Sequence, residues 1–385
     1  MLLHLSKQDW TLSFSNSQVI RNIDPLGFDE WLQIVPAANA NQDTNTLVAL
    51  LSLLARRASN ALWSAPEFAH ASVRDIGIVI GSLKRHGIEP MQAVPSAEKF
   101  LLGYSNQCDA VPRDTLHHYT LWNPIDRRRR TYTEDQQERK LQDSVSFVLP
   151  YFGTAVAACS SLCELDPRDS QFTSMVGVLS QATRKVIDSI DTVVAEVSPH
   201  FFARQLRPYF EEILIGKKNY FGPAASQIPL WLIDVCVWAS DRNHPEYQSF
   251  LLESLKYNPP SWRALYQKHA GRRSLVSKIE SLLSDKDFQN SKQLLRSATS
   301  LIELLHFLKI FRGRHMSIAK RAYDPEVALY SHGSGGGPLD LLRRILRLTT
   351  DNEHLLRHAS AQQKPSTEKA LQQATDSGLQ PQEKS

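Results

Sequence analysis

The stretch RGRHMSIAKRAYDPEVALYSHGSGGGPLD, residues 312–340, combines several residue types that can take part in catalysis. The imidazole of His315 can bind a metal ion or transfer a proton. The phenol of Tyr323 and the hydroxyl of Ser334 can both donate and accept hydrogen bonds. Glycines at 333 and 335–337 allow the backbone to approach a ligand closely and to expose successive N–H groups. The stretch is therefore a candidate catalytic or binding site.

The helix expected before this stretch determines where His315 points. Apolar residues follow a four–three–four–three spacing along one helical face: Leu294, Ala298, Leu301, Leu305 and Leu308. The same spacing continues through Arg312, His315, Ala319 and Ala322. His315 is thus expected to face the core, either as a histidine bonded to a carbonyl or as a ligand of a metal or haem. Arg312 on the same face needs an anionic partner, for which a haem propionate or a substrate carboxylate would serve.

The glycine-rich loop SHGSGGGPLD has two interpretations. Its spacing matches neither the dinucleotide-binding fingerprint nor the Walker loop. It is either a flexible connector or a set of backbone donors for an anion. The helix expected to start at Pro338 adds an N-terminus that favours negative charge.

The elements that would position these groups are mainly helical, so the predicted fold class is mostly α. In ASVRDIGIVIGSLKRHGIEP, we expect Ser72 to cap a helix with Asp75 in its first turn. Gly87 suits the position after the last turn, and Pro90 prevents continuation. We also expect a helix around 143–160, bent or interrupted at Pro150.

The chain is expected to divide into two parts and a tail. Residues 1–140 form a small mixed and helical N-terminal part, with one possible strand at WTLSFSN, residues 10–16. Residues 141–360 form a large helical domain. Residues 361–385 are rich in Gln, Ser, Lys, Thr and Glu, which predicts a disordered tail.

Composition argues against several classes of protein. A formal net charge of +4 over 385 residues is far from the footprint of a dedicated nucleic-acid binder, and we expect the arginine run 127–130 to be a solvated loop. Neither a membrane span nor a signal peptide is expected. The four cysteines are then reduced thiols of a cytoplasmic protein. Cys159 and Cys163 share a helical face, but no neighbouring cluster completes a metal site, so they are interpreted as buried small apolar residues.

Several longer motifs resemble one known family. FRGRHMSIAKRAY, GSGGGPLDLLRRILRLTT, VSPHFFARQLRPYF and YFGPAASQ are similar to the indoleamine 2,3-dioxygenase superfamily. Within it, RDIGIVIGSLKRHGIEP, LWNP and QLRPYFEEILIGKKNYFGP are most similar to the branch that acts in pyrrolnitrin formation. The resemblance runs from about residue 70 to 355, with the motifs in order.

The resemblance implies a helical fold that binds haem b between a small N-terminal and a large C-terminal domain. It implies that His315 is the proximal iron ligand. Tyr323 and Ser334 would line the substrate site and act on the bound amino acid. From their own chemistry, the cation of Arg312 and the backbone N–H groups at Gly335 and Gly336 are also predicted to contact the cofactor.

The same resemblance assigns further residues to the substrate. Arg207 would hold its carboxylate, because an arginine fork suits that group, although an interhelix salt bridge is the alternative. Phe202 would lie against the indole, with Ala203 where the dioxygenases have a second aromatic residue. Ala225 would leave a small-residue surface beside the ligand. On the distal face the candidates are Ser146, Phe147 and Tyr151.

The activity implied is an oxidative rearrangement of L-tryptophan, or of a ring-substituted tryptophan such as the 7-chloro compound, with dioxygen or peroxide as the oxidant. Two alternatives remain at this point. One is a dioxygenase of the same superfamily that forms N-formylkynurenine. The other is a haem sensor without catalytic activity.

Overall fold

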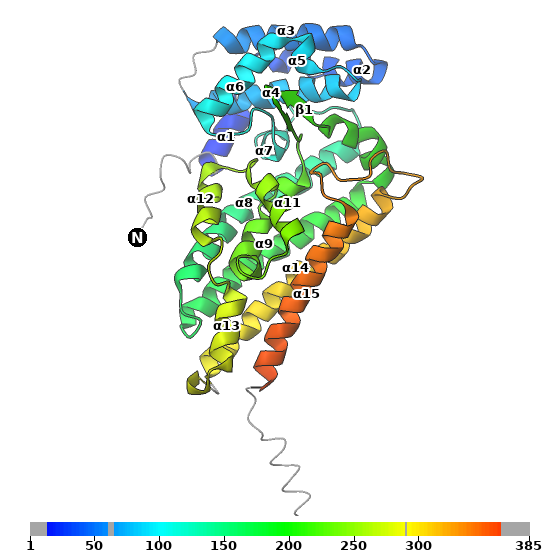
Figure 1. Ribbon diagram of the computed structural model, residues 1–385. Coiled ribbons are helices and arrows are strands. Elements are labelled where there is room, and N and C mark those ends of the chain that lie inside the picture. Colours follow the sequence, from blue (N-terminus) through cyan, green and yellow to red (C-terminus); the bar gives the residue numbers. More distant parts are fainter. Residues whose placement is uncertain (1–13, 61–64, 289–290, 363–385) are drawn as a thin grey trace, which may run out of the picture.

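The computed structural model describes residues 14–60, 65–288 and 291–362. Short helices form a layer at one end of the molecule, and long helices run away from it (Figure 1). The layer contains η2 (Phe28–Trp31), α2 (Ile34–Asn41), α3 (Thr44–Asn60), α4 (Pro66–Arg85), α5 (Pro90–Ala93) and α6 (Pro95–Cys108), while α1 (Phe14–Asn22) lies between it and the long helices, whose core includes Ile20. The short α7 (Leu116–Tyr119) follows, at the junction with the long helices.

The long helices are α8 (Gln136–Glu164), α9 (Ser170–Glu196), α14 (Lys292–Ala322) and α15 (Leu339–Gln362). Between α9 and α14 the chain forms η3 (Phe201–Leu206), η4 (Arg207–Phe210), η5 (Ala225–Gln227), α10 (Leu230–Asp234), η6 (Val235–Ala239), α11 (Pro245–Leu255), α12 (Pro260–His269), α13 (Leu275–Ser284) and η7 (Lys286–Phe288). Strands β1 (Ile213–Ile215) and β2 (Lys218–Tyr220) pair antiparallel, with Ile213 opposite Tyr220. The mostly α prediction is confirmed.

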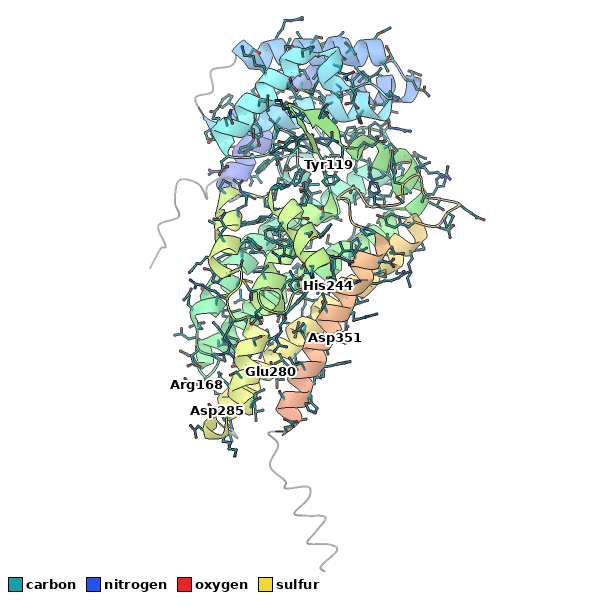
Figure 2. All side chains as sticks on the ribbon, in the orientation of Figure 1. Tyr119, Arg168, His244, Glu280, Asp285 and Asp351 are labelled. Carbon is teal, nitrogen blue, oxygen red and sulfur yellow. The ribbon has the colours of Figure 1, made fainter. Side chains whose placement is uncertain are left out.

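Two hydrophobic cores underlie this arrangement. One joins α2–α4 and α6 to the segment 197–215, through residues such as Leu51, Ile76 and Phe201. The other fills the space among α8–α15, through residues such as Phe152 and Leu305. Tyr119, labelled in Figure 2, lies where the two regions meet and packs edge-on against Phe210. Segment 197–215 therefore packs on the N-terminal core although it follows residue 140, and the division at residue 140 stays a prediction.

The start of α4 differs from the sequence-based expectation. The helix begins at Pro66, so Ser72 lies inside it and its hydroxyl donates to Phe68 O at 2.8 Å. Proline is favourable in a first turn because its missing N–H would have no intrahelical partner there. The predicted end is confirmed, since α4 stops at Arg85 and Gly87 has a φ of +75°.

The arginine run 127–130 is only partly the solvated loop that we expected, because Arg127 is exposed and Arg128 half-buried, whereas Arg129 and Arg130 are buried. Arg130 is fully buried, and its Nε lies 2.8 Å from Asp75 Oδ1. Asp75 also pairs with Arg74 at 2.8 Å, and Arg129 pairs with Asp143 at 2.6 Å. The burial of these cations is compensated by carboxylates from distant parts of the chain, which sequence spacing does not reveal.

Two further expectations concern the ends of the chain. The strand prediction for residues 10–16 is wrong at its end, because Phe14 begins α1; residues 10–13 lie outside the described part. The tail prediction also falls outside the described residues, except that α15 continues to Gln362.

Within the described ranges, α8 is the one helix long and apolar enough to cross a membrane by length and composition alone. Half of its most apolar window is buried inside the protein, and Phe152, Ala155 and Cys159 belong to a core. It also continues through Pro150. We interpret α8 as a core helix of this bundle.

Candidate active site

Helix α14 carries the candidate histidine on the predicted face. Leu301, Leu305 and Leu308 are fully buried, as expected for the apolar side of an amphipathic helix. The helix ends at Ala322, and Tyr323 is its C-cap. The loop 324–338 then connects α14 to α15, which starts at Leu339, one residue after the predicted Pro338.

His315 differs from an ordinary core histidine in having no hydrogen bond within the described part of the chain. Its ring is partly accessible to solvent and lies 5.9 Å from the ring of Phe311, centroid to centroid. Burial lowers its pKa, so the imidazole is neutral at neutral pH. A neutral imidazole with a free ring nitrogen is the form that binds iron. The chemistry of this residue therefore fits that of an iron ligand, and His315 is the residue that would hold a haem group.

Arg312, one turn earlier, has its anion inside the protein. Its Nη2 donates to Asp234 Oδ2 and its Nη1 donates to Thr349 Oγ1. Asp234 also accepts hydrogen bonds from Trp238 Nε1 and Tyr247 Oη. Arg312 is 7% exposed and Asp234 is 1% exposed, so both members of the ion pair are buried inside the helical bundle. These contacts lend no support to the predicted role of Arg312 toward a cofactor, and that role stays a prediction.

Arg207 is the opposite case. It starts η4 directly after the π-helix η3, a type of distortion that often occurs at functional sites. It is 6% exposed, yet its Nε and Nη1 have no hydrogen-bond partner among the described residues. Its Nη2 makes one long bond of 3.4 Å to Gly333 O. A buried guanidinium with this many unpaired donors is costly, so the arrangement indicates an anionic ligand.

The C-cap residue Tyr323 and the loop 324–338 lie next to Arg207. A Cβ added at Gly333 would lie 2.6 Å from Tyr323 Oη, so the phenol lies directly against the loop backbone. Burial raises the pKa of Tyr323, while the nearby Arg207 cation lowers it. Ser334 is buried, at 9% exposure. An open cavity of about 480 Å³ adjoins this region, between Tyr323 and Tyr330.

The glycines of the loop approach protein rather than open space. A Cβ on Gly335 would collide with Ser226 Oγ, and one on Gly336 would lie 2.8 Å from the ring of Phe221. Gly336 also has a φ of +79°, which favours glycine. These contacts explain the composition of the loop through packing against 221–226. The cofactor role expected for Gly335 and Gly336 stays a prediction.

The remaining predicted residues lie on three different segments, with Phe202 on η3, Ala225 on η5 and the distal candidates on α8. Phe202 is partly buried beside the N-terminal core, and Ala225 is exposed at the start of η5. Of the distal candidates on α8, Phe147 is 45% exposed and Tyr151 is 38% exposed. Ser146 donates to Thr120 O at 3.0 Å. No contact in the described part of the chain connects these three with His315.

The comparison with known families is decisive for identity. Residues 45–371 match the family described as Monodechloroaminopyrrolnitrin synthase PrnB, which is most of the chain. The chain belongs to the monodechloroaminopyrrolnitrin synthase family. It is thus an enzyme of the kind that oxidatively rearranges a tryptophan-like substrate in pyrrolnitrin biosynthesis. Members of this family depend on haem.

Three residues that sequence reasoning missed now belong to the site region. Asp234 neutralises Arg312, and the sequence signal was a lone carboxylate inside the apolar run PLWLIDVCVW. Tyr330 stacks on Arg207, with 4.3 Å between the guanidinium carbon and the ring centroid. The Tyr330 hydroxyl donates to Glu211 Oε1. The last two pairings join segments far apart in the chain, and no spacing signal connects them.

Proposed function

We propose that this protein oxidatively rearranges L-tryptophan or a ring-substituted tryptophan with haem b. In this proposal His315 binds the haem iron, and Arg207 holds the substrate carboxylate. The observation that carries the substrate part is the buried guanidinium of Arg207, whose Nε and Nη1 lack partners in the described structure. A carboxylate would supply the missing charge and accept from the planar donor fork. The haem part rests on family membership and on the neutral, unbonded His315.

The protein's own groups have separate roles in this proposal. Bound haem would supply the oxidative chemistry toward dioxygen or peroxide. Arg207 would fix the amino-acid end of the substrate. The protonated phenol of Tyr323, whose pKa burial raises, can donate its O–H to the substrate carboxylate or accept a hydrogen bond from the substrate amine at its oxygen. The buried hydroxyl of Ser334 offers a second donor from the loop. We further propose that the enzyme acts in the cytoplasm.

The carboxylate assignment is testable with a ligand that lacks the carboxylate. Binding of tryptophan and tryptamine to wild type and Arg207→Met is measured by isothermal titration calorimetry. Wild type should bind tryptophan more tightly than tryptamine. Arg207→Met should lose that preference, because removal of a buried charge pair should lower its affinity for tryptophan by roughly 30-fold or more. An Arg207→Met variant that keeps the preference would refute the assignment.

The reaction class is tested by mass spectrometry of products formed from tryptophan and 7-chlorotryptophan. An arylpyrrole that has lost the carboxylate supports the proposed rearrangement. N-formylkynurenine would indicate a dioxygenase instead. Absence of any product with haem-loaded, substrate-binding protein would indicate a sensor.

A further inference from the structure

Tyr330 lies between Arg207 and an acidic side chain that Arg207 would otherwise attract. The ring of Tyr330 stacks against the guanidinium at 4.3 Å, and its hydroxyl donates to Glu211 Oε1. Glu211 is four residues after Arg207, on the same segment; burial lowers the pKa of Arg207, and the negative charge of Glu211 acts in the opposite direction. Even so, no ion pair joins these two residues in the described structure. The hydroxyl of Tyr330 donates to one carboxylate oxygen of Glu211, and its ring covers one face of the Arg207 guanidinium.

Another buried arginine holds the backbone of Glu211 in place. Arg113 is fully buried, and its Nη1 donates to the backbone O of Glu211 at 2.5 Å and to Tyr220 O at 2.9 Å. The backbone that carries Glu211 is therefore held in place. Whether the carboxylate reaches Arg207 or stays with Tyr330 is then decided by side-chain rotation and by the position of the loop.

The loop that carries Tyr330 is tied to the Arg207 segment at two further points. Arg204 Nη2 donates to Glu326 O at 2.7 Å, and Arg207 Nη2 donates to Gly333 O at 3.4 Å. Together with the Tyr330–Glu211 bond, these contacts lay the loop 324–338 across Arg207. Tyr323, another predicted substrate residue, lies close enough to act on the charge of the same cation, and Ser334 follows Gly333 in the chain.

We propose that Tyr330 is a positioning residue that keeps Arg207 free for the substrate carboxylate. Its ring supports the guanidinium through a cation–π contact, and its hydroxyl donates to the carboxylate of Glu211, which with Glu212 is one of the two carboxylates whose charge acts on Arg207. This inference rests on the proposed role of Arg207. Without the Tyr330 hydroxyl, Glu211 turns to Arg207 and competes with substrate from inside the protein.

The test is a rescue experiment with calorimetric binding of tryptophan and tryptamine. Tyr330→Phe keeps the ring but releases Glu211, so tryptophan affinity should fall by about tenfold, the equivalent of one modest charge pair, while tryptamine affinity is unchanged. Glu211→Gln removes the competing charge and should bind tryptophan like wild type. The double variant Tyr330→Phe/Glu211→Gln should regain most of the lost affinity. A residue that merely stabilises the loop would not be rescued in this way.

The control is His332→Ala in the same loop, an exposed residue that should leave both affinities unchanged. Circular dichroism and the unfolding temperature establish that each variant is folded. The proposal is overturned if Tyr330→Phe binds tryptophan like wild type, if it loses both ligands equally, or if Glu211→Gln does not rescue it. Failure of the Arg207 assignment is seen separately, as an Arg207→Met variant that still prefers tryptophan over tryptamine.

Discussion

Two buried arginines on either side of the candidate site have opposite surroundings. Arg312 is 7% exposed and bonded to Asp234 and Thr349, so its charge is neutralised within the bundle. Arg207 is 6% exposed, but its Nε and Nη1 have no partner among the described residues. Equal burial thus accompanies two different roles. The satisfied cation joins α14 to α10 and α15, and in the proposed function the unsatisfied one binds the substrate carboxylate.

Buried histidines show the same contrast. His118 Nδ1 accepts from Thr115 N at 3.0 Å, and Tyr104 Oη lies 2.9 Å from His70 Nδ1. Burial lowers the pKa of both histidines. His315 is also neutral, but it has no such bonds within the described residues. The contrast is not complete, because the buried His117 also has no hydrogen bond at either ring nitrogen in the described structure; His315 differs from it in being partly accessible to solvent.

The largest expected effect comes from breaking the satisfied pair. Asp234→Ala leaves Arg312 buried without an anion and removes the acceptor of Tyr247 and Trp238. The free energy of unfolding should fall by about 3–5 kcal/mol, measured by urea denaturation. The double variant Asp234→Ala/Arg312→Met removes both charges and should recover part of the loss. A fall below about 1 kcal/mol in the single variant would contradict the assigned role.

The next largest effect is expected from acid, which should lower the stability of the protein through the buried histidine His70. Burial lowers the pKa of His70 to about 3, from 6.5 in the unfolded chain. Above pH 6.5 neither the folded nor the unfolded chain binds this proton, so the free energy of unfolding is unaffected. As the pH falls from 6.5 toward 3, only the unfolded chain takes up the proton, so the free energy of unfolding decreases. The slope is roughly 1.4 kcal/mol per pH unit for each such histidine. Urea denaturation at pH 7, 6 and 5 should show a shallower slope in His70→Gln than in wild type.

A smaller effect is expected at the second partner of Arg312. Thr349→Val keeps the shape of the side chain and removes the oxygen that accepts from Nη1. The loss should be about 1 kcal/mol, because Asp234 still neutralises the arginine. The unfolding midpoint in urea measures it. A loss as large as that of Asp234→Ala would show that the threonine, rather than the ion pair, stabilises this region.

The smallest effect on stability is expected at Arg207. Arg207→Met removes a buried charge that has no compensating anion, so the free energy of unfolding should stay within about 0.5 kcal/mol of wild type or rise. The same urea titration, run beside Arg312→Met, provides the direct comparison. A loss of several kcal/mol in Arg207→Met would mean that the arginine is structural after all.

The sequence predicted local features well and long-range pairing poorly. The stripe through Leu301, Leu305 and Leu308 and the glycine stop at Gly87 depend on near neighbours, and both are confirmed. Ser72 was misplaced because two start signals compete, and the proline six residues earlier begins the helix. The partners of Arg130, Arg312 and Arg207 are distant in the chain. Spacing along one chain contains no information about such contacts.

The central claim is that His315 is the residue that binds haem iron. Haem titration of wild type, His315→Ala and the exposed loop variant His332→Ala, followed by the Soret spectrum under anaerobic conditions, tests it most directly. We predict the same spectrum for wild type and His332→Ala. For His315→Ala we predict weaker binding with altered ligation, restored toward wild type by added imidazole. Unchanged ligation in His315→Ala, or no haem binding by wild type, would contradict the claim.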